Sequence, residues 1–145
     1  MSYQLHQQLK KDTFKLGEFE LCDVLLMNDA RYPWVILVPK RDAISEIFQL
    51  SQTEQRQLQS ESSFVAKAMK DLFSADKMNI AALGNMVEQL HLHHVARFRS
   101  DAAWPKPIWG QGQAENYSEV AVKAISSQLR RVLKQNLISD ENLTF

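Results

Sequence analysis

Three of the four histidines in the chain fall within four consecutive positions, at His91, His93 and His94. Side chains on a β-strand alternate between the two faces of a sheet, so an extended segment places His91 and His93 on one face, about 6.5–7 Å apart along the strand. Two imidazoles at that spacing can act on one phosphoryl group. A neutral imidazole can attack phosphorus while its neighbour donates a hydrogen bond to a phosphoryl oxygen.

Other interpretations of the cluster stay open. His-x-His is also a ligand pattern for divalent metals, although only His6 remains as a further histidine and no Asp or Glu stands two or four positions from His91. Strand histidines can also be purely structural. His94 shares its face with apolar residues and with Glu88. We therefore expect His94 to be structural, with a local hydrogen bond for which Glu88 is the candidate partner.

The elements that must position the histidines follow from the hydrophobic pattern. Apolar runs at 19–27 and 34–39 flank a turn segment rich in Asn, Asp and Pro, and predict an antiparallel hairpin. A second hairpin is expected from 78–83 and 86–98, because Gly84-Asn85 between them is typical of tight turns. The histidines would then lie in the last of these strands.

Three helices are expected beside the strands. The first is short and covers 3–11, and the last covers about 118–137. The longest begins after Ser51, whose spacing to Glu54 is that of a capping box, and ends near 74–76. Hairpins combined with helices predict an α+β fold, with an antiparallel sheet of about five strands and helices on one face.

Composition argues against several function classes. Lysine plus arginine and aspartate plus glutamate each number 17, so no general electrostatic attraction to nucleic acid or to an anionic membrane is expected. The longest strongly apolar run, 34–38, is too short to cross a bilayer, and the N-terminal segment lacks the apolar core of a signal peptide. Cys22 is the only cysteine. We expect a single cytoplasmic domain over 1–145 without disulfides.

The segment around the histidines resembles the signature strand of the histidine triad (HIT) family of nucleotide hydrolases and transferases. That signature reads His-φ-His-φ-His-φ-φ, where φ is apolar, and the corresponding residues here are Gln89-Leu90-His91-Leu92-His93-His94-Val95. The resemblance implies that His91 is the nucleophile, that His93 contacts the phosphate and that Asn85 lies near the leaving phosphate. Gln89 replaces the first histidine and cannot act as an acid.

The first predicted hairpin resembles the nucleoside-binding hairpin of the same family. The resemblance implies that Asn28 or Asp29 binds the ribose hydroxyls, and that Leu26 and Met27 belong to the apolar lining of a base pocket. Arg97 continues the face of His91 if the strand stays regular that far, which makes it a candidate ligand for a substrate phosphate.

The resemblance covers residues 18–110 and implies a nucleotidyl hydrolase or transferase. Its substrates would be nucleoside phosphates, phosphoramidates or dinucleotides, and it would act through a covalent nucleotidyl-histidine intermediate without a metal or other cofactor. The family commonly forms homodimers, and Trp104 and Trp109 are candidates for contact with a base or a second subunit. Because the first histidine is replaced, a nucleotide-binding module with little or no turnover is the main alternative, and a metal-binding sheet protein is a third.

Overall fold

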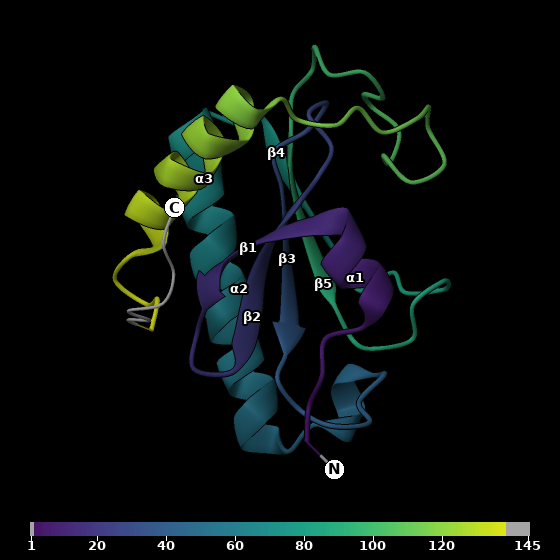
Figure 1. Cartoon of the computed structure of the whole chain (residues 1–145), viewed down its shortest axis with the longest axis vertical. Helices are drawn as coiled ribbons and strands as arrows, with labels where there is room; N and C mark the ends of the chain where they lie inside the picture. The colour runs from purple at the N-terminus through teal and green to yellow at the C-terminus, as the bar shows by residue number, and fades with distance from the viewer. Residues whose placement is uncertain (1, 139–145) are drawn as a thin grey trace.

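Five strands form one antiparallel sheet in the order β1-β2-β3-β5-β4 (Figure 1). The structure is a computed structural model that describes residues 2–138. Its strands are β1 (Thr13–Glu18), β2 (Cys22–Met27), β3 (Trp34–Pro39), β4 (Lys77–Ala81) and β5 (Leu92–Arg97). The predicted α+β fold with about five antiparallel strands is confirmed.

Two long helices, α2 (Gln52–Phe73) and α3 (Glu119–Leu133), cover one face of the sheet, while the short α1 (Gln7–Asp12) lies on the other (Figure 1). The capping box predicted for α2 is present. The Ser51 hydroxyl accepts from the Glu54 amide at 3.1 Å, and the Glu54 carboxylate accepts from the Ser51 amide at 2.9 Å.

The hydrophobic core has two parts, one on each face of the sheet. The larger lies between the sheet and the helices α2 and α3. The smaller lies on the opposite face, where α1 and the loop 99–117 cover β2, β3 and β5. The face expected to be open is therefore partly covered. None of the described helices has both the length and the apolar character needed to span a bilayer.

The second hairpin differs from the sequence prediction. Ala81 pairs with His93 and Lys77 with Arg97, so 82–91 is a loop, and the tight turn predicted at Gly84-Asn85 is wrong. The loop bonds to segments outside the hairpin. One example is the Leu90 amide, which donates to the Ile44 carbonyl at 2.9 Å. β5 accordingly begins at Leu92, later than predicted.

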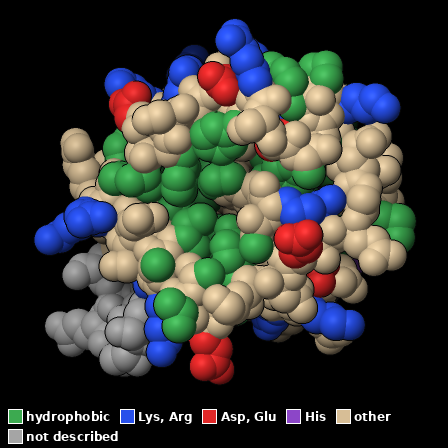
Figure 2. Space-filling model, turned by 90° about the horizontal axis from the view of Figure 1, so that it is seen from above, with side chains coloured by type: hydrophobic (Ala, Val, Ile, Leu, Met, Phe, Trp, Pro, Cys, Tyr) green, Lys and Arg blue, Asp and Glu red, His purple; other side chains and the backbone are tan. Residues whose placement is uncertain are grey.

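β1 was not expected from the sequence. Its segment, TFKLGE, alternates polar and apolar residues only from Thr13 to Leu16, and a register shift between Lys15 and Gly17 interrupts the strand. One end of the molecule carries a patch of hydrophobic side chains surrounded by charged ones, and no histidine is visible there (Figure 2). The histidine cluster therefore does not open on that end.

Candidate active site

His91 and His93 lie together on the sheet face opposite α2 and α3, as the alternation predicts. His91 directly precedes β5, and His93 is its second residue. Both residues are 6 % exposed. Their ring centroids are 4.9 Å apart with an edge-to-face orientation. Two buried imidazoles in contact can therefore act on the same chemical group of a substrate.

The backbone orients the His91 ring. Its Nδ1 lies 2.7 Å from the carbonyl oxygen of Gln89. A carbonyl can only accept, so Nδ1 carries the hydrogen and Nε2 keeps its lone pair. A neutral histidine with a free Nε2 lone pair is the form that attacks an electrophile.

Both ring nitrogens of His93 are bonded within the protein. Nδ1 lies 3.0 Å from Nε1 of Trp34, and Nε2 lies 2.9 Å from the carbonyl oxygen of Leu83. Burial of the ring is the main reason that the pKa of His93 falls to about 4. His93 is therefore neutral at physiological pH.

The loop 82–91 shapes the surroundings of His91. A Cβ on Gly84 would lie 2.6 Å from the carbonyl oxygen of Val87 and 3.2 Å from Cε1 of His91, so only glycine fits there. The Gln89 side chain accepts from the His6 amide at 2.8 Å and donates to the Gln4 carbonyl at 2.9 Å. Gln89 thus ties the N-terminal segment to the loop.

Two cavities meet at His91. The polar cavity, of about 280 Å³, is lined by Ser45, Glu46, Ala82, Gly84, Asn85, Glu88, Gln89, Leu90 and His91. The apolar cavity, of about 360 Å³, is lined by Gln8, Leu9, Asp12, Met27, Trp34, Ile36, Leu83, Gly84, Asn85, Met86, Val87, His91, His93 and Trp109. The linings hold three carboxylates and neither lysine nor arginine. Asn85 and His91 belong to both cavities, and Met27 lies at the apolar one as the family resemblance implies.

Leu26 and Asn28 do not lie at either cavity. Leu26 is fully buried in the core beneath α2 and α3, because it points to the face opposite that of Met27. The Asn28 side-chain oxygen accepts from the Tyr117 amide at 2.9 Å. Neither residue therefore fits the nucleoside-binding role expected for it.

Asp29 is occupied by a local ion pair. Its carboxylate accepts from Nε of Arg31 at 3.0 Å and from Nη2 of Arg31 at 2.8 Å, and it also accepts from the Arg31 and Glu115 amides. Burial alone would raise the pKa of Asp29, but the hydrogen bonds from Arg31 outweigh it and hold the pKa below its usual value. With a side chain only 1 % exposed, Asp29 holds its turn and is not available to ribose.

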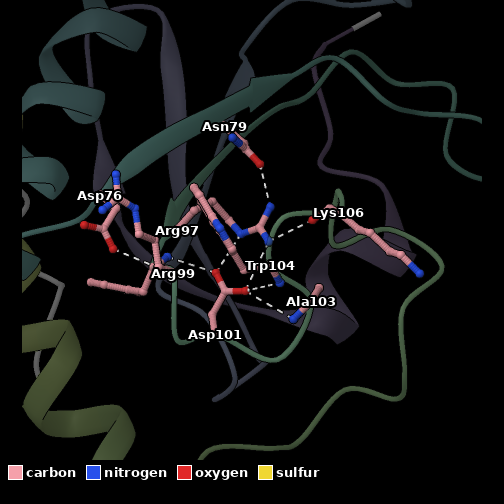
Figure 3. A network of polar contacts seen from close by, with 9 residues as sticks. Asp76, Asn79, Arg97, Arg99, Asp101, Ala103, Trp104 and Lys106 are labelled. Atoms are coloured by element: carbon pink, nitrogen blue, oxygen red, sulfur yellow. Dashed lines mark hydrogen bonds and ion pairs between the residues drawn. The ribbon is translucent and has the colours of Figure 1, made fainter.

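Arg97 also has a structural position (Figure 3). Its guanidinium donates to Asp101 at 2.8 and 3.1 Å, to the Asn79 side chain at 2.7 Å and to the Lys106 carbonyl at 2.8 Å. It also lies over the rings of Tyr32 and Trp104. The side chain is 2 % exposed. Arg97 therefore fixes the loop that follows β5 and does not fit the expected role of a phosphate ligand.

His94 has the structural position expected for it, but with another partner. Its Nε2 lies 2.7 Å from the hydroxyl of Ser62 on α2, and its Nδ1 lies 3.3 Å from the carbonyl oxygen of Val35. Burial lowers the pKa of His94 to about 4. The partner predicted from the sequence, Glu88, is exposed at the polar cavity instead.

Sequence reasoning missed several residues of the apolar cavity. Trp34 and Ile36 share the cavity face of β3, and the pairing of Ile36 with His93 brings that face beside the histidines. The alternation of β3 was a signal for both. Asp12 reaches the cavity only because α1 docks on this face, which nothing in the local sequence indicates. Trp109, by contrast, was a candidate from the sequence, and its ring packs edge-to-face on His93 with centroids 5.3 Å apart.

The comparisons with known proteins assign the family. The model of the HIT domain matches residues 8–100. The chain belongs to the histidine triad family. Members of this family are nucleotide-binding hydrolases and transferases, and the resemblance seen in the sequence is confirmed. No curated protein matches the sequence.

Three solved bacterial structures are similar over nearly their whole length. A histidine triad protein from Marinobacter aquaeolei VT8 is 50% identical, with 94% of this chain and 99% of that chain covered and a TM-score of 0.92. One from Bradyrhizobium japonicum is 46% identical, with 90% and 98% covered and a TM-score of 0.88. One from Sinorhizobium meliloti 1021 is 41% identical, with 93% and 97% covered and a TM-score of 0.87.

The hypothesis of a metal site has little support in the arrangement of ligands. Among residues 2–138, no group of three or more His, Cys, Asp and Glu side chains is arranged to hold a metal ion. The ring nitrogens of His93 are both bonded within the protein, and so is Nδ1 of His91.

Proposed function

We propose that this protein is a nucleotidyl hydrolase or transferase in which His91 attacks the phosphorus next to the nucleoside. The observation that carries the proposal is the hydrogen bond from Nδ1 of His91 to the Gln89 carbonyl, 2.7 Å long. It directs the Nε2 lone pair away from the backbone, and His91 lies where an apolar and a polar cavity meet.

The reaction would take two steps. A bond forms between Nε2 of His91 and phosphorus while the bond from phosphorus to the leaving group breaks, and that group departs with the electron pair and a proton from solvent. Water then attacks the nucleotidyl-imidazole, the bond to Nε2 breaks, and a nucleoside monophosphate leaves. Asn85 would donate to the phosphoryl oxygens as negative charge develops on them, and the Nε2–H of His93 would do so only by leaving the Leu83 carbonyl.

The apolar cavity suits the nucleoside. Its lining combines Leu9, Met27, Ile36 and Trp109, and such apolar and aromatic side chains bind a planar base. Asp12, which replaces Asp29 in our proposal, supplies a carboxylate at the edge of this cavity, where its Oδ2 accepts from Gln8 at 2.8 Å. A carboxylate can accept hydrogen bonds from two ribose hydroxyls.

The charge of the two linings favours substrates with a single phosphoryl group. Among the residues of the two linings, Asp12, Glu46 and Glu88 carry a carboxylate and none is a lysine or an arginine. A polyphosphate chain would meet negative groups without a compensating cation, which is unfavourable at close range. We therefore place nucleoside phosphoramidates before dinucleoside polyphosphates as the substrate class.

A nucleotide-binding module with little turnover is the second candidate. It is favoured by Gln89, which stands in place of the first histidine of the signature and uses its amide as a tie to the N-terminal segment.

Turnover of adenosine 5′-phosphoramidate, followed as release of AMP, separates the two candidates. We expect steady release by the wild-type protein, release reduced by at least about 1,000-fold in His91→Ala, and no loss in Lys67→Ala, which changes an exposed side chain on α2. Binding of AMP without release of AMP from the phosphoramidate would favour the binding module.

A further inference from the structure

Two consecutive hydrogen bonds link β3 to the loop beside His91. Nε1 of Trp34 lies 3.0 Å from Nδ1 of His93, and Nε2 of His93 lies 2.9 Å from the carbonyl oxygen of Leu83. An indole N–H can only donate and a carbonyl can only accept. On a neutral His93 ring, both hydrogen bonds can therefore form only when the hydrogen is on Nε2.

The neighbouring histidine of the same strand shows the opposite arrangement. Nδ1 of His94 lies 3.3 Å from the Val35 carbonyl, so its hydrogen belongs on Nδ1. Nε2 of His94 faces the Ser62 hydroxyl at 2.7 Å, which can donate to it. The tautomer of each ring thus follows from whether the group facing Nδ1 donates or accepts.

We propose that Trp34 is a positioning residue that fixes His93 as the neutral Nε2–H tautomer, so that His93 holds the 82–91 loop through its hydrogen bond to the Leu83 carbonyl. In the other tautomer, the lone pair of Nε2 would face the lone pairs of the Leu83 carbonyl, and the hydrogen on Nδ1 would face the Trp34 N–H. Both contacts would become repulsive.

The catalytic consequence rests on the proposed function. Gly84 and Asn85 follow Leu83 directly and line both cavities. Loss of the His93–Leu83 hydrogen bond would loosen the segment that carries these two residues.

Trp109 provides a matched control for the substitution of Trp34. Its ring also packs against His93, with centroids 5.3 Å apart compared with 5.6 Å for Trp34. Nε1 of Trp109 is buried and finds no acceptor among the described residues. Trp34→Phe and Trp109→Phe therefore each remove an indole N–H beside the same imidazole, but only the first removes a hydrogen bond to it.

The test is nitrogen-15 NMR of the histidine side chains, which distinguishes the tautomers and needs no substrate. In the wild-type protein we expect the Nε2–H form for His93 and the Nδ1–H form for His94 between pH 6 and 8, because the pKa of each is lowered to about 4. Trp34→Phe leaves the Leu83 carbonyl as the one group that selects the tautomer, so a minor Nδ1–H population of His93 should appear, with shifted amide signals at Leu83 and Gly84. Trp109→Phe should leave the His93 tautomer unchanged.

A kinetic measurement with adenosine 5′-phosphoramidate completes the test. Loss of one hydrogen bond predicts kcat about tenfold lower for Trp34→Phe, with a smaller change in KM, and a smaller effect for Trp109→Phe. An Nδ1–H tautomer of His93 in the wild-type protein, or an unchanged tautomer in Trp34→Phe, would overturn the proposal. Wild-type protein that turns over no nucleotide would instead overturn the proposed function, whereas the tautomer result would stand.

Discussion

The buried ion pair between Arg97 and Asp101 predicts a large and pH-dependent effect on stability. The Asp101 side chain is 3 % exposed. It accepts from the Arg97 guanidinium and from the amides of Phe98, Ala103 and Trp104 (Figure 3). Substitution Asp101→Asn would remove the partner charge and leave the guanidinium buried. We expect a loss of about 3–5 kcal/mol in the free energy of unfolding.

The acid dependence follows from the pKa of Asp101. Burial by itself would raise this pKa, but the hydrogen bonds from Arg97 and the backbone outweigh it and lower the pKa from 3.8 to about 2. That difference corresponds to about 2.4 kcal/mol. Because the folded-state pKa is depressed, this stabilisation is present above about pH 4 and is lost as the pH falls toward 2. At pH 3 the loss is about 1 kcal/mol.

Urea denaturation at pH 7 and at pH 3 measures both effects. The wild-type protein should lose about 1 kcal/mol through Asp101 between these pH values, and Asp101→Asn should lack this contribution. The matched control is Asp71→Asn, which breaks an ion pair with Lys67 whose side chains are 80% and 67% exposed, and should cost less than about 0.5 kcal/mol. Equal and small losses for both variants would refute the reasoning.

Three further predictions concern the loop, the nucleoside and the assembly. Gly84→Ala places a Cβ 2.6 Å from the Val87 carbonyl, so the loop must move. We expect kcat to fall about 10- to 100-fold, and an unchanged kcat would show that the loop is not needed. Asp12→Asn should weaken binding of AMP by about 1.5–3 kcal/mol but leave binding of 2′,3′-dideoxy-AMP nearly unchanged. Calorimetry measures both affinities. Equal losses for the two ligands would argue against contact between Asp12 and ribose. The protein should be a homodimer, because β4 has an unpaired edge within the described chain and Ile80 on it is 49% exposed. Light scattering should give a molecular mass of twice the 16.7 kDa of one chain. A molecular mass equal to that of one chain would contradict the prediction.

The parts of the site predicted from the sequence depend on strand alternation. Alternation placed His91 and His93 together and His94 on the helix side, and it holds even though His91 lies outside β5. The strand at 34–39 and the cap at Ser51 were also predicted correctly. In each case the signal is local, because a residue's position in its own strand or first helical turn decides its environment.

The features that differ from the sequence prediction depend on which partner a residue finds in the folded chain. Gly84-Asn85 has the composition of a tight turn, but the loop is held by the N-terminal segment and by Ile44. Asp29 has the position of a ribose ligand, but Arg31, two residues later, pairs with it. The position of Asp12 at the apolar cavity was missed because the docking of α1 decides it. Tertiary packing decides the loop and the position of Asp12, and neither has a local signature, whereas Arg31 stands close to Asp29 in the sequence.

Rapid-quench mass spectrometry during turnover of adenosine 5′-phosphoramidate tests the central claim most directly. We expect an adenylyl group on the peptide that contains His91. This adduct should form faster than AMP is released, and it should be absent from His91→Ala. Turnover without any covalent adduct, or an adduct that persists in His91→Ala, would contradict the assignment of His91 as the nucleophile.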